Sequence, residues 1–372
     1  MFEILFNSLF INFFILNIFF IINNKYFKLD KVIFGYLLLY HLLITFFYIF
    51  YFKDGAADYK TYLNLTTFQG FNFKGLVSAD LITTVCAFFK NILFFDDYNI
   101  ILFFSLLSLT GIIIFYKNLI KLGLEKRIAV FFLFIPGMHF WTCIPGKDSI
   151  ILFLLAFFFY FYLDKKLIVS LLFVFAVFLV RPHIGFIFFT SVIITEFFLM
   201  RGTKKIFFIL LLVSISLIVL NTESVNYFFI DQKSVSDNIL IQMFSHFNNF
   251  TEKFVLSDTG YKSSFFLFNI FNYLIIPTEF IFKNNSLIVN LSIMIELLVF
   301  SLFIHFILKS KKVFFDKKVF YFLLICCLFY FLIIPQALFN FGINIRQKWM
   351  ILPFFIYFSF LLKYLLVKIN NR

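Results

Sequence analysis

The sequence contains few of the residues that cross-link or punctuate soluble domains. Its 372 residues include 4 cysteines, 6 prolines and 12 glycines. The cysteines show neither a CxxC pair nor a His/Cys spacing suited to zinc, so we expect no structural disulfide and no metal site. No internal repeat and no Pro-, Gly- or Ser-rich linker divides the chain. These absences favour a single domain over residues 1–372.

Motifs of several common enzyme classes are missing too. The chain has no Walker A sequence, no HExxH, no GxSxG, and no GxGxxG in a βαβ context. Its Asp96-Asp97 pair is adjacent, whereas a DxD-like site for a metal and a nucleotide sugar needs spaced acids. Chemistry driven by ATP or by a soluble sugar donor is therefore not expected, and no cofactor is implied.

Long apolar runs are abundant instead. The chain is 63% hydrophobic, has a mean hydropathy of +1.00 and contains 69 phenylalanines, which is more apolar surface than one soluble core of this length can hold. The predicted fold class is all-α: a polytopic transmembrane helical bundle of about eleven spans. The candidate spans lie at 4–22, 32–52, 98–116, 128–145, 149–163, 167–181, 184–200, 206–221, 287–308, 319–337 and 349–367.

The first run, 4–22, lacks a basic segment before it and a small-residue cleavage site, so we interpret it as a retained span and not as a signal peptide. Charge then orients the bundle. If the short loops and the tail from 363 lie in the cytoplasm, they contain 20 of the 32 Lys and Arg residues. Because cytoplasmic loops are usually rich in Lys and Arg, this predicts an external N-terminus and a cytoplasmic C-terminus. Residues 53–97 become an external loop with an amphipathic or re-entrant helix, and 222–286 become a large external loop.

Three sets of charged residues share one predicted depth. Lys147 and Asp148 lie 17 and 16 residues before the predicted turn at 164–166, and Arg181 lies 15 residues after it. Helical rise converts this separation to roughly 22–26 Å, whereas the hydrocarbon core is about 30 Å thick. Antiparallel helices pack about 8–10 Å apart, so we expect the Asp148 carboxylate within about 10 Å of the Arg181 guanidinium.

The last predicted span brings two more cations to a similar depth. Arg346 and Lys348 precede Lys363 by 17 and 15 residues. Together with Lys147 and Arg181 they form a surplus of positive charge that fits a pyrophosphate, and a guanidinium suits bidentate capture of phosphate. Alternatives remain open: an Asp148–Arg181 ion pair of structural value alone, or ordinary snorkelling of the cations near 346–348.

Other polar residues are candidates for the same pocket. In the segment PGMHFWTCIPGKD, His139 and Trp141 should lie in the outer half of the bilayer, as a polar cleft floor or as a hydrogen-bonded His and an aromatic-belt Trp. In the first external loop, Asp58 and Tyr59 combine a carboxylate with an aromatic ring, a pairing that can hold sugars. Glu196 is a further possible functional acid without an identified partner.

Four of these segments resemble the Wzy-type and EpsG-like repeat-unit polymerases, bacterial membrane proteins of capsule, O-antigen and exopolysaccharide biosynthesis. The segments are Asp58-Tyr59 after the second span, the block from Pro136 to Asp148, Arg-Pro-His at 181–183, and Arg-Gln-x-Trp at 346–349. The resemblance covers most of the chain in layout but about thirty residues in motif. It departs from the family in its short hydrophilic loops, since only 222–286 compares with a large external loop.

This resemblance implies a membrane glycosyltransferase in the bacterial cytoplasmic (inner) membrane, with its site facing the outside or periplasm. It would pass a growing glycan from undecaprenyl pyrophosphate to a polyprenyl-pyrophosphate-linked oligosaccharide repeat, without a metal, with a chain-length regulator or flippase as a further partner. The substrate-binding residues would be Arg181, Arg346, Lys147, Lys348, Tyr59 and Trp141, and the candidate bases are, in order, Asp148, His183, His139 and Asp58.

Two other functions remain open from the sequence. A flippase or transporter of lipid-linked oligosaccharide would use the same cations to escort pyrophosphate, although inverted repeats or acidic relays would be more usual for it. A glycosyltransferase that uses a polyprenyl-phosphate sugar would differ mainly in the size of its donor. None of the three needs nucleic acid, because the net charge of +13 is mostly cytoplasmic anchoring.

Overall fold

The part of the chain that the structure describes is all-helical. The computed structural model describes residues 2–27, 29–51, 58–64, 78–200, 305, 316–337 and 341–370, and within them it contains helices and no strand. The α-helices are α1 Phe2–Ile22, α2 Lys31–Tyr51, α3 Asp58–Asn64, α4 Ser78–Asn91, α5 Asp97–Lys121, α6 Lys126–Phe132, α7 Pro136–Thr142, α8 Lys147–Leu163, α9 Leu167–Val180, α10 Pro182–Leu199, α17 Lys317–Ala337 and α18 Phe341–Asn370; a short π-helix, Asn23–Phe27, follows α1.

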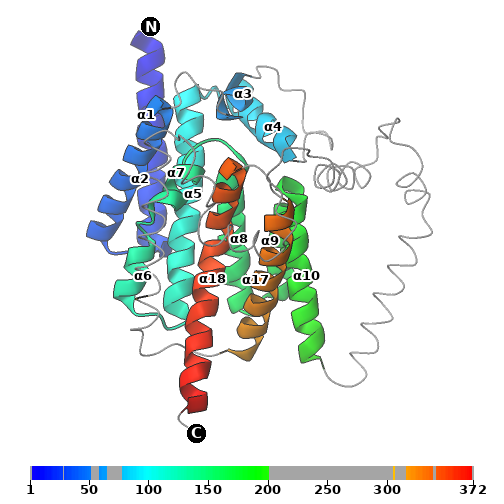
Figure 1. Cartoon of the computed structure of the whole chain (residues 1–372). Helices are drawn as coiled ribbons and strands as arrows, with labels where there is room; N and C mark the ends of the chain where they lie inside the picture. Colours follow the sequence, from blue (N-terminus) through cyan, green and yellow to red (C-terminus); the bar gives the residue numbers. More distant parts are fainter. Residues whose placement is uncertain are drawn as a thin grey trace, which may run out of the picture.

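Five of these helices form a closed circuit of packing contacts. Helix α8 packs against α9, α9 against α10, α10 against α17 and α17 against α18, which in turn contacts α8 again. We call this arrangement the five-helix ring. Helix α5 packs along the other side of α8, and α1 and α2 pack against α5. Figure 1 shows the helices side by side, with the two ends of the chain at opposite ends of the bundle.

Phenylalanine rings fill the centre of the five-helix ring. Phe158 and Phe159 of α8, Phe188 of α10, Phe322 of α17 and Phe354 of α18 are all fully buried. Ring centroids lie 4.8 Å apart for Phe188–Phe354, 5.1 Å for Phe159–Phe354 and 5.5 Å for Phe158–Phe322, each with a large interplanar angle. Such edge-to-face pairs contribute about 0.5–1.5 kcal/mol each beyond the area they bury. Some of the phenylalanine side chains therefore form the packing contacts between these helices.

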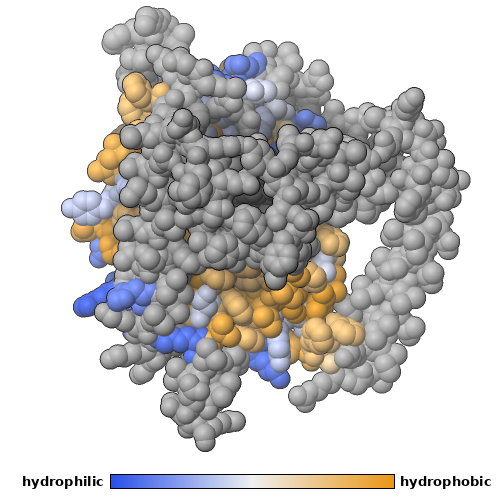
Figure 2. All heavy atoms as spheres, in the orientation of Figure 1, coloured by the Kyte–Doolittle hydropathy of each residue, from blue (hydrophilic) through white to orange (hydrophobic). Residues whose placement is uncertain are grey.

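Among the described residues, three helices are long and apolar enough to cross a membrane: Lys31–Phe50 of α2, Asp97–Lys121 of α5 and Pro182–Leu199 of α10. Large apolar side chains on α2, including Phe46 and Phe50, are 70% exposed, as lipid-facing residues would be. Figure 2 shows hydrophobic surface on the side of the molecule, with hydrophilic residues below it and near the top.

The predicted number of eleven spans is not confirmed. In the described part of the chain, the apolar stretches Ile11–Ile22, Leu167–Val180 and Trp349–Lys363 have helical form but fall short of 18 residues. The spans predicted at 206–221 and 287–308 lie outside the described residues.

The span predicted at 128–145 is two short helices, α6 and α7. Pro136 has no backbone N–H and restricts the residue before it, and Ile135 is accordingly extended. The carbonyl groups freed by this break are bonded by side chains. The Tyr40 hydroxyl donates to the Phe134 carbonyl at 3.3 Å, and His139 Nε2 lies 2.7 Å from the Leu133 carbonyl oxygen. A broken helix is thereby tolerated inside protein.

Basic residues of several predicted cytoplasmic loops gather at one end of the bundle. The Lys117 ammonium donates to the Tyr26 carbonyl at 2.7 Å, which joins the end of α5 to the turn after α1. Lys121 pairs with Asp164 at the end of α8. These contacts link three of the loops that the charge pattern assigns to a single face.

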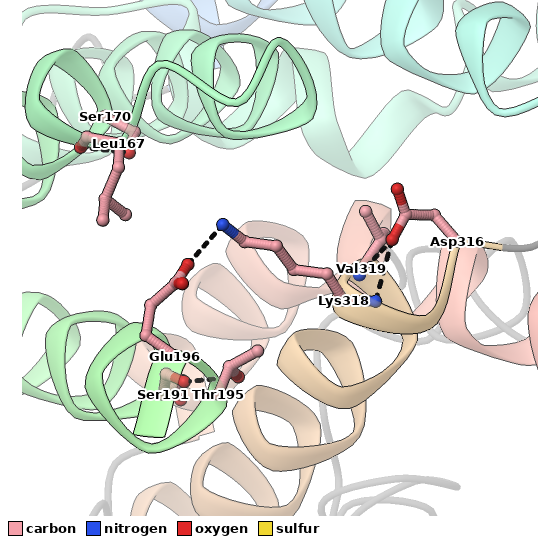
Figure 3. A network of polar contacts seen from close by, with 8 residues as sticks. All are labelled: Leu167, Ser170, Ser191, Thr195, Glu196, Asp316, Lys318 and Val319. Atoms are coloured by element: carbon pink, nitrogen blue, oxygen red, sulfur yellow. Dashed lines mark hydrogen bonds and ion pairs between the residues drawn. The ribbon is translucent and has the colours of Figure 1, made fainter. Parts of the chain in front are cut away.

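The ends of α10 and α17 meet at the same side, where Glu196 and Lys318 form an ion pair (Figure 3). Asp316 begins α17 by accepting the backbone N–H groups of Lys318 at 2.8 Å and Val319 at 3.2 Å. The Lys318 ammonium also lies 5.1 Å from the centre of the Tyr162 ring of α8. Glu196 thus has a structural partner that the sequence did not identify.

Two short helices lie at the opposite end of the bundle, where the N-terminus is found (Figure 1). Helix α4 has 14 residues, about 21 Å, so it is too short to cross a bilayer. Ile82 and Cys86 are buried on one side of α4, whereas Asp80 is exposed, and Lys90 pairs with Asp97 at the start of α5 at 2.6 Å. Helix α4 is therefore amphipathic, and the external position predicted for the 53–97 segment stays a prediction. The predicted 222–286 loop lies outside the described residues.

Candidate functional site

The candidate site is built on the hairpin of α8 and α9. Its turn is tight: Lys165 has a left-handed φ of 59°, and the Lys166 N–H donates to the Phe161 carbonyl at 3.0 Å. The turn joins two antiparallel helices of similar length, so the start of α8 lies beside the end of α9. Arg181 Nη2 donates to Asp148 Oδ1 at 2.6 Å, which confirms the predicted proximity.

This ion pair is buried: the side chains of Arg181 and Asp148 are 12% and 3% exposed. Both charges lie at helix ends. Asp148 lies in the first turn of α8, where the helix dipole favours an anion, whereas Arg181 lies between the end of α9 and the start of α10, whose dipoles oppose each other at this position. The ion pair predicted above as a structural alternative is therefore present. Asp148 holds Arg181 in place.

Part of Arg181 remains available. Its Nη1 atom is buried and donates to no atom of the described residues. Buried donors are normally satisfied by a water, a ligand or another part of the protein, so this nitrogen is a candidate for binding one of these. A guanidinium with one edge on a carboxylate and the other unbonded can bind an anionic oxygen without losing its support.

The chain is irregular on both sides of the pair. Pro145 and the extended Gly146 precede α8, and Arg181 itself is extended, with φ −140° and ψ 94°, between α9 and Pro182 at the start of α10. Gly185 allows this sharp turn, because a Cβ there would lie 2.3 Å from the Phe178 Cα atom. Two helix breaks consequently face each other across the ion pair.

Lys147 and His183 lie close to the ion pair in the sequence. Lys147 is the first residue of α8 and His183 the second residue of α10; both are partly exposed. The backbone places both residues near Asp148 and Arg181 by their positions in the chain, and a role for their side chains in a common site stays a prediction.

Helix α18 supplies the other predicted cations and contacts both α7 and α8. Its Trp349 is buried with its ring on Gly137 of α7, where an added Cβ would lie 1.9 Å from Trp349 Cζ2. Trp349 Nε1 is also buried and has no partner among the described residues. The backbone of Arg346 and Lys348 belongs to α18, but their side chains lie outside the described part, so their convergence on Arg181 stays a prediction.

His139 is not placed beside the ion pair. It is fully buried, and both of its ring nitrogens are engaged, Nδ1 at 2.6 Å from His41 Nδ1 and Nε2 with Leu133. A base needs a nitrogen that can reach the substrate. The prediction of His139 as a candidate base therefore finds no support in its contacts.

The aromatic candidates are packed into protein. The Tyr59 side chain is 5% exposed, and its ring lies 6.2 Å from that of Tyr48, so it does not present a face to a sugar. Trp141 is partly exposed and packs edge-on against Phe140 at 5.0 Å. Asp58 begins α3, and its side chain lies outside the described part.

Two residues of this region were missed by sequence reasoning. His41 is an ionisable side chain near the middle of an apolar run, a signal that could have marked it. Gly137 gave no such signal, because only the packed Trp349 ring shows why the position excludes a side chain.

Among known proteins, no family model, no curated protein and no solved structure matches this chain.

Proposed function

We propose that the chain is an oligosaccharide repeat-unit polymerase of a bacterial cytoplasmic membrane. It transfers a growing glycan from undecaprenyl pyrophosphate to a lipid-linked oligosaccharide repeat at the external face. One observation carries the proposal: a buried Arg181 is held by Asp148 through one nitrogen, and its other terminal nitrogen is unbonded within the described residues. This arrangement suits an anion that must be bound firmly and released.

In the proposed reaction, the bond between the sugar carbon and the donor pyrophosphate breaks, and a hydroxyl of the acceptor sugar forms a new bond to that carbon. Negative charge develops on the leaving pyrophosphate, where Arg181 stabilises it together with Lys147 and, from α18, Arg346 or Lys348. The acceptor proton goes to His183, which neighbours Arg181 in the chain. Asp148 acts mainly through Arg181, since its carboxylate is already engaged.

A transporter or flippase of lipid-linked oligosaccharide is the second candidate. The His41–His139 contact favours it, because ionisable groups inside a membrane span often belong to proton relays. The polymerase is preferred, since the four sequence segments that carry the resemblance include the ion pair and not His41.

The test uses purified protein in lipid vesicles supplied with polyprenyl-pyrophosphate-linked repeats. The wild type should produce lengthened glycans without any soluble donor. Arg181→Lys keeps the charge and can still pair with Asp148, but it loses the planar fork that would hold the carboxylate and an anion on two edges. The polymerisation rate should therefore fall by about 10- to 100-fold, the equivalent of about 1.5–3 kcal/mol for one charged hydrogen bond.

The matched control is Lys318→Arg, an exchange of the same two residue types in the ion pair at the other end of the bundle. Its polymerisation rate should equal that of the wild type. Full activity of Arg181→Lys would remove Arg181 from the mechanism. Movement of the lipid-linked repeats across the vesicle membrane without lengthening would favour the transporter.

A further inference from the structure

The contact between His41 and His139 defines a site apart from the ion pair. His41 lies on α2 and His139 on α7, and both are 0% exposed. Their Nδ1 atoms are 2.6 Å apart. His41 Nε2 lies 2.8 Å from the Ser105 carbonyl oxygen on α5, and His139 Nε2 lies 2.7 Å from the Leu133 carbonyl oxygen.

Counting protons in this arrangement shows that two neutral rings do not fit it. A carbonyl oxygen only accepts, so each Nε2 must carry a hydrogen to bond its carbonyl. A neutral imidazole has one N–H, and with Nε2 protonated on both rings the two Nδ1 lone pairs would face each other at 2.6 Å. One additional proton between the Nδ1 atoms converts this repulsion into a short, charge-assisted hydrogen bond.

The neighbouring hydroxyls offer an arrangement for the state without that proton. Ser108 Oγ donates to the Ser105 carbonyl at 2.8 Å but also lies 3.3 Å from His41 Nε2. If His41 held its only hydrogen on Nδ1, its bare Nε2 would face the Ser105 carbonyl, and a rotation of the Ser108 hydroxyl could supply a hydrogen to it. Ser108 can therefore serve either state by turning its hydroxyl hydrogen.

Neither a metal nor a neighbouring charge accounts for the contact. Metal–nitrogen bonds of about 2.0 Å would hold two histidine nitrogens much further apart than 2.6 Å. From α2, the phenol of Tyr40 faces His139 edge-on, with ring centroids 5.0 Å apart. The polar groups of α5 at the pair are Ser105 and Ser108, and no Asp, Glu, Lys or Arg side chain of the described residues contacts either ring.

We propose that His41 and His139 form a proton-binding site inside the bundle, in which the two rings share one proton between their Nδ1 atoms. His41 is ten residues from each end of α2, so the site lies roughly 15 Å from either end of that helix. The rings take up and release this proton as a unit. Binding of this proton tightens the contact between α2 and α7. Gly137 of α7 contacts the Trp349 ring.

The site is tested by solid-state NMR of the full chain, labelled with ¹⁵N-histidine, in lipid vesicles over a range of pH. Subtracting the spectrum of His41→Gln from that of the wild type isolates the pair. We expect both Nε2 atoms protonated, a through-bond coupling between the two Nδ1 atoms, and a single titration step that both rings share. In His41→Gln the coupling and the shared step disappear.

His305→Gln, which replaces an exposed histidine, should retain both the coupling and the shared step. If His41→Gln does not fold, the wild-type coupling decides alone, since among the described histidines only this pair is joined through ring nitrogens. Unprotonated Nδ1 atoms on both rings at every pH at which the protein is folded would overturn the proposal. Separate titration of the two rings would overturn it as well. Both outcomes are independent of whether the protein polymerises glycans.

Discussion

At the scale of single residues, the burial of the Asp148–Arg181 pair makes substitution of either residue costly in stability. Removing one member of a buried ion pair leaves the other uncompensated, which typically costs about 3–5 kcal/mol. Loss of function in a variant that lacks Arg181 altogether would therefore mix a chemical with a structural effect. The Lys substitution separates them, because the ammonium can still neutralise Asp148.

Gly137 provides a residue-scale prediction for the support of the site. Gly137→Ala places a methyl group 1.9 Å from Trp349 Cζ2, so the ring must move, and such overpacking typically costs about 1–3 kcal/mol. The matched control is Gly35→Ala on α2, where an added Cβ meets no atom within 4 Å and alanine improves helix propensity. Thermal unfolding in detergent should show a lower midpoint for Gly137→Ala alone. Equal midpoints for the two variants would contradict the Trp349 contact.

At the scale of elements, two helix breaks contribute to the polar sites described above. The break before Pro136 frees carbonyl oxygens that His139 and Tyr40 bond, and the break before Pro182 holds Arg181 extended. Uninterrupted helices satisfy their own backbone and offer lipid only side chains. Prolines therefore locate the two polar sites more reliably than the phenylalanine-rich runs do.

Helix α4 provides a test of the predicted external position of this segment. Burial raises the pKa of the Cys86 thiol to about 12, against about 8.5 for a free cysteine, so at pH 8 only about one thiol in 10⁴ is ionised. The thiolate fraction grows as pH rises toward 12. A membrane-impermeant maleimide added to intact vesicles should therefore leave Cys86 unlabelled at pH 8, as measured by mass spectrometry.

The control uses the exposed side of the same helix. Asp80→Cys should acquire one label rapidly from outside the vesicle, because position 80 is exposed. Labelling of Cys86 at the same rate would show that α4 does not pack on the bundle through this side.

At the scale of the whole molecule, the predicted orientation can be tested directly. The N-terminal residues and α4 lie at one end, and the contacts of Lys117, Lys121 and Lys318 lie at the other. Cysteines introduced at Lys121 and Lys311 should react with an impermeant reagent only after the membrane is opened. Labelling of either position in intact cells would contradict the predicted orientation, and with it the external placement of the Asp148–Arg181 pair.

The sequence predicted the helical class, the hairpin and the ion pair, because helical rise converts residue counts directly into depth. Spacing along one helix could not predict which helices meet. The packing of Trp349 on Gly137 and of His41 on His139 joins residues 212 and 98 apart, so these contacts depend on the tertiary arrangement alone. For the same reason Glu196 had no visible partner until α17 was placed beside α10.

The five-helix ring has a consequence for the continuity of the chain. Helices α10 and α17 are joined by packing and by the Glu196–Lys318 pair, although the 117 residues from 200 to 316 separate them in the chain. The ring is thus closed by side chains at this point. A protease that cut the backbone between residues 200 and 316 would leave two polypeptides that stay associated and purify together, and the two pieces produced from separate genes would reassemble by the same contacts.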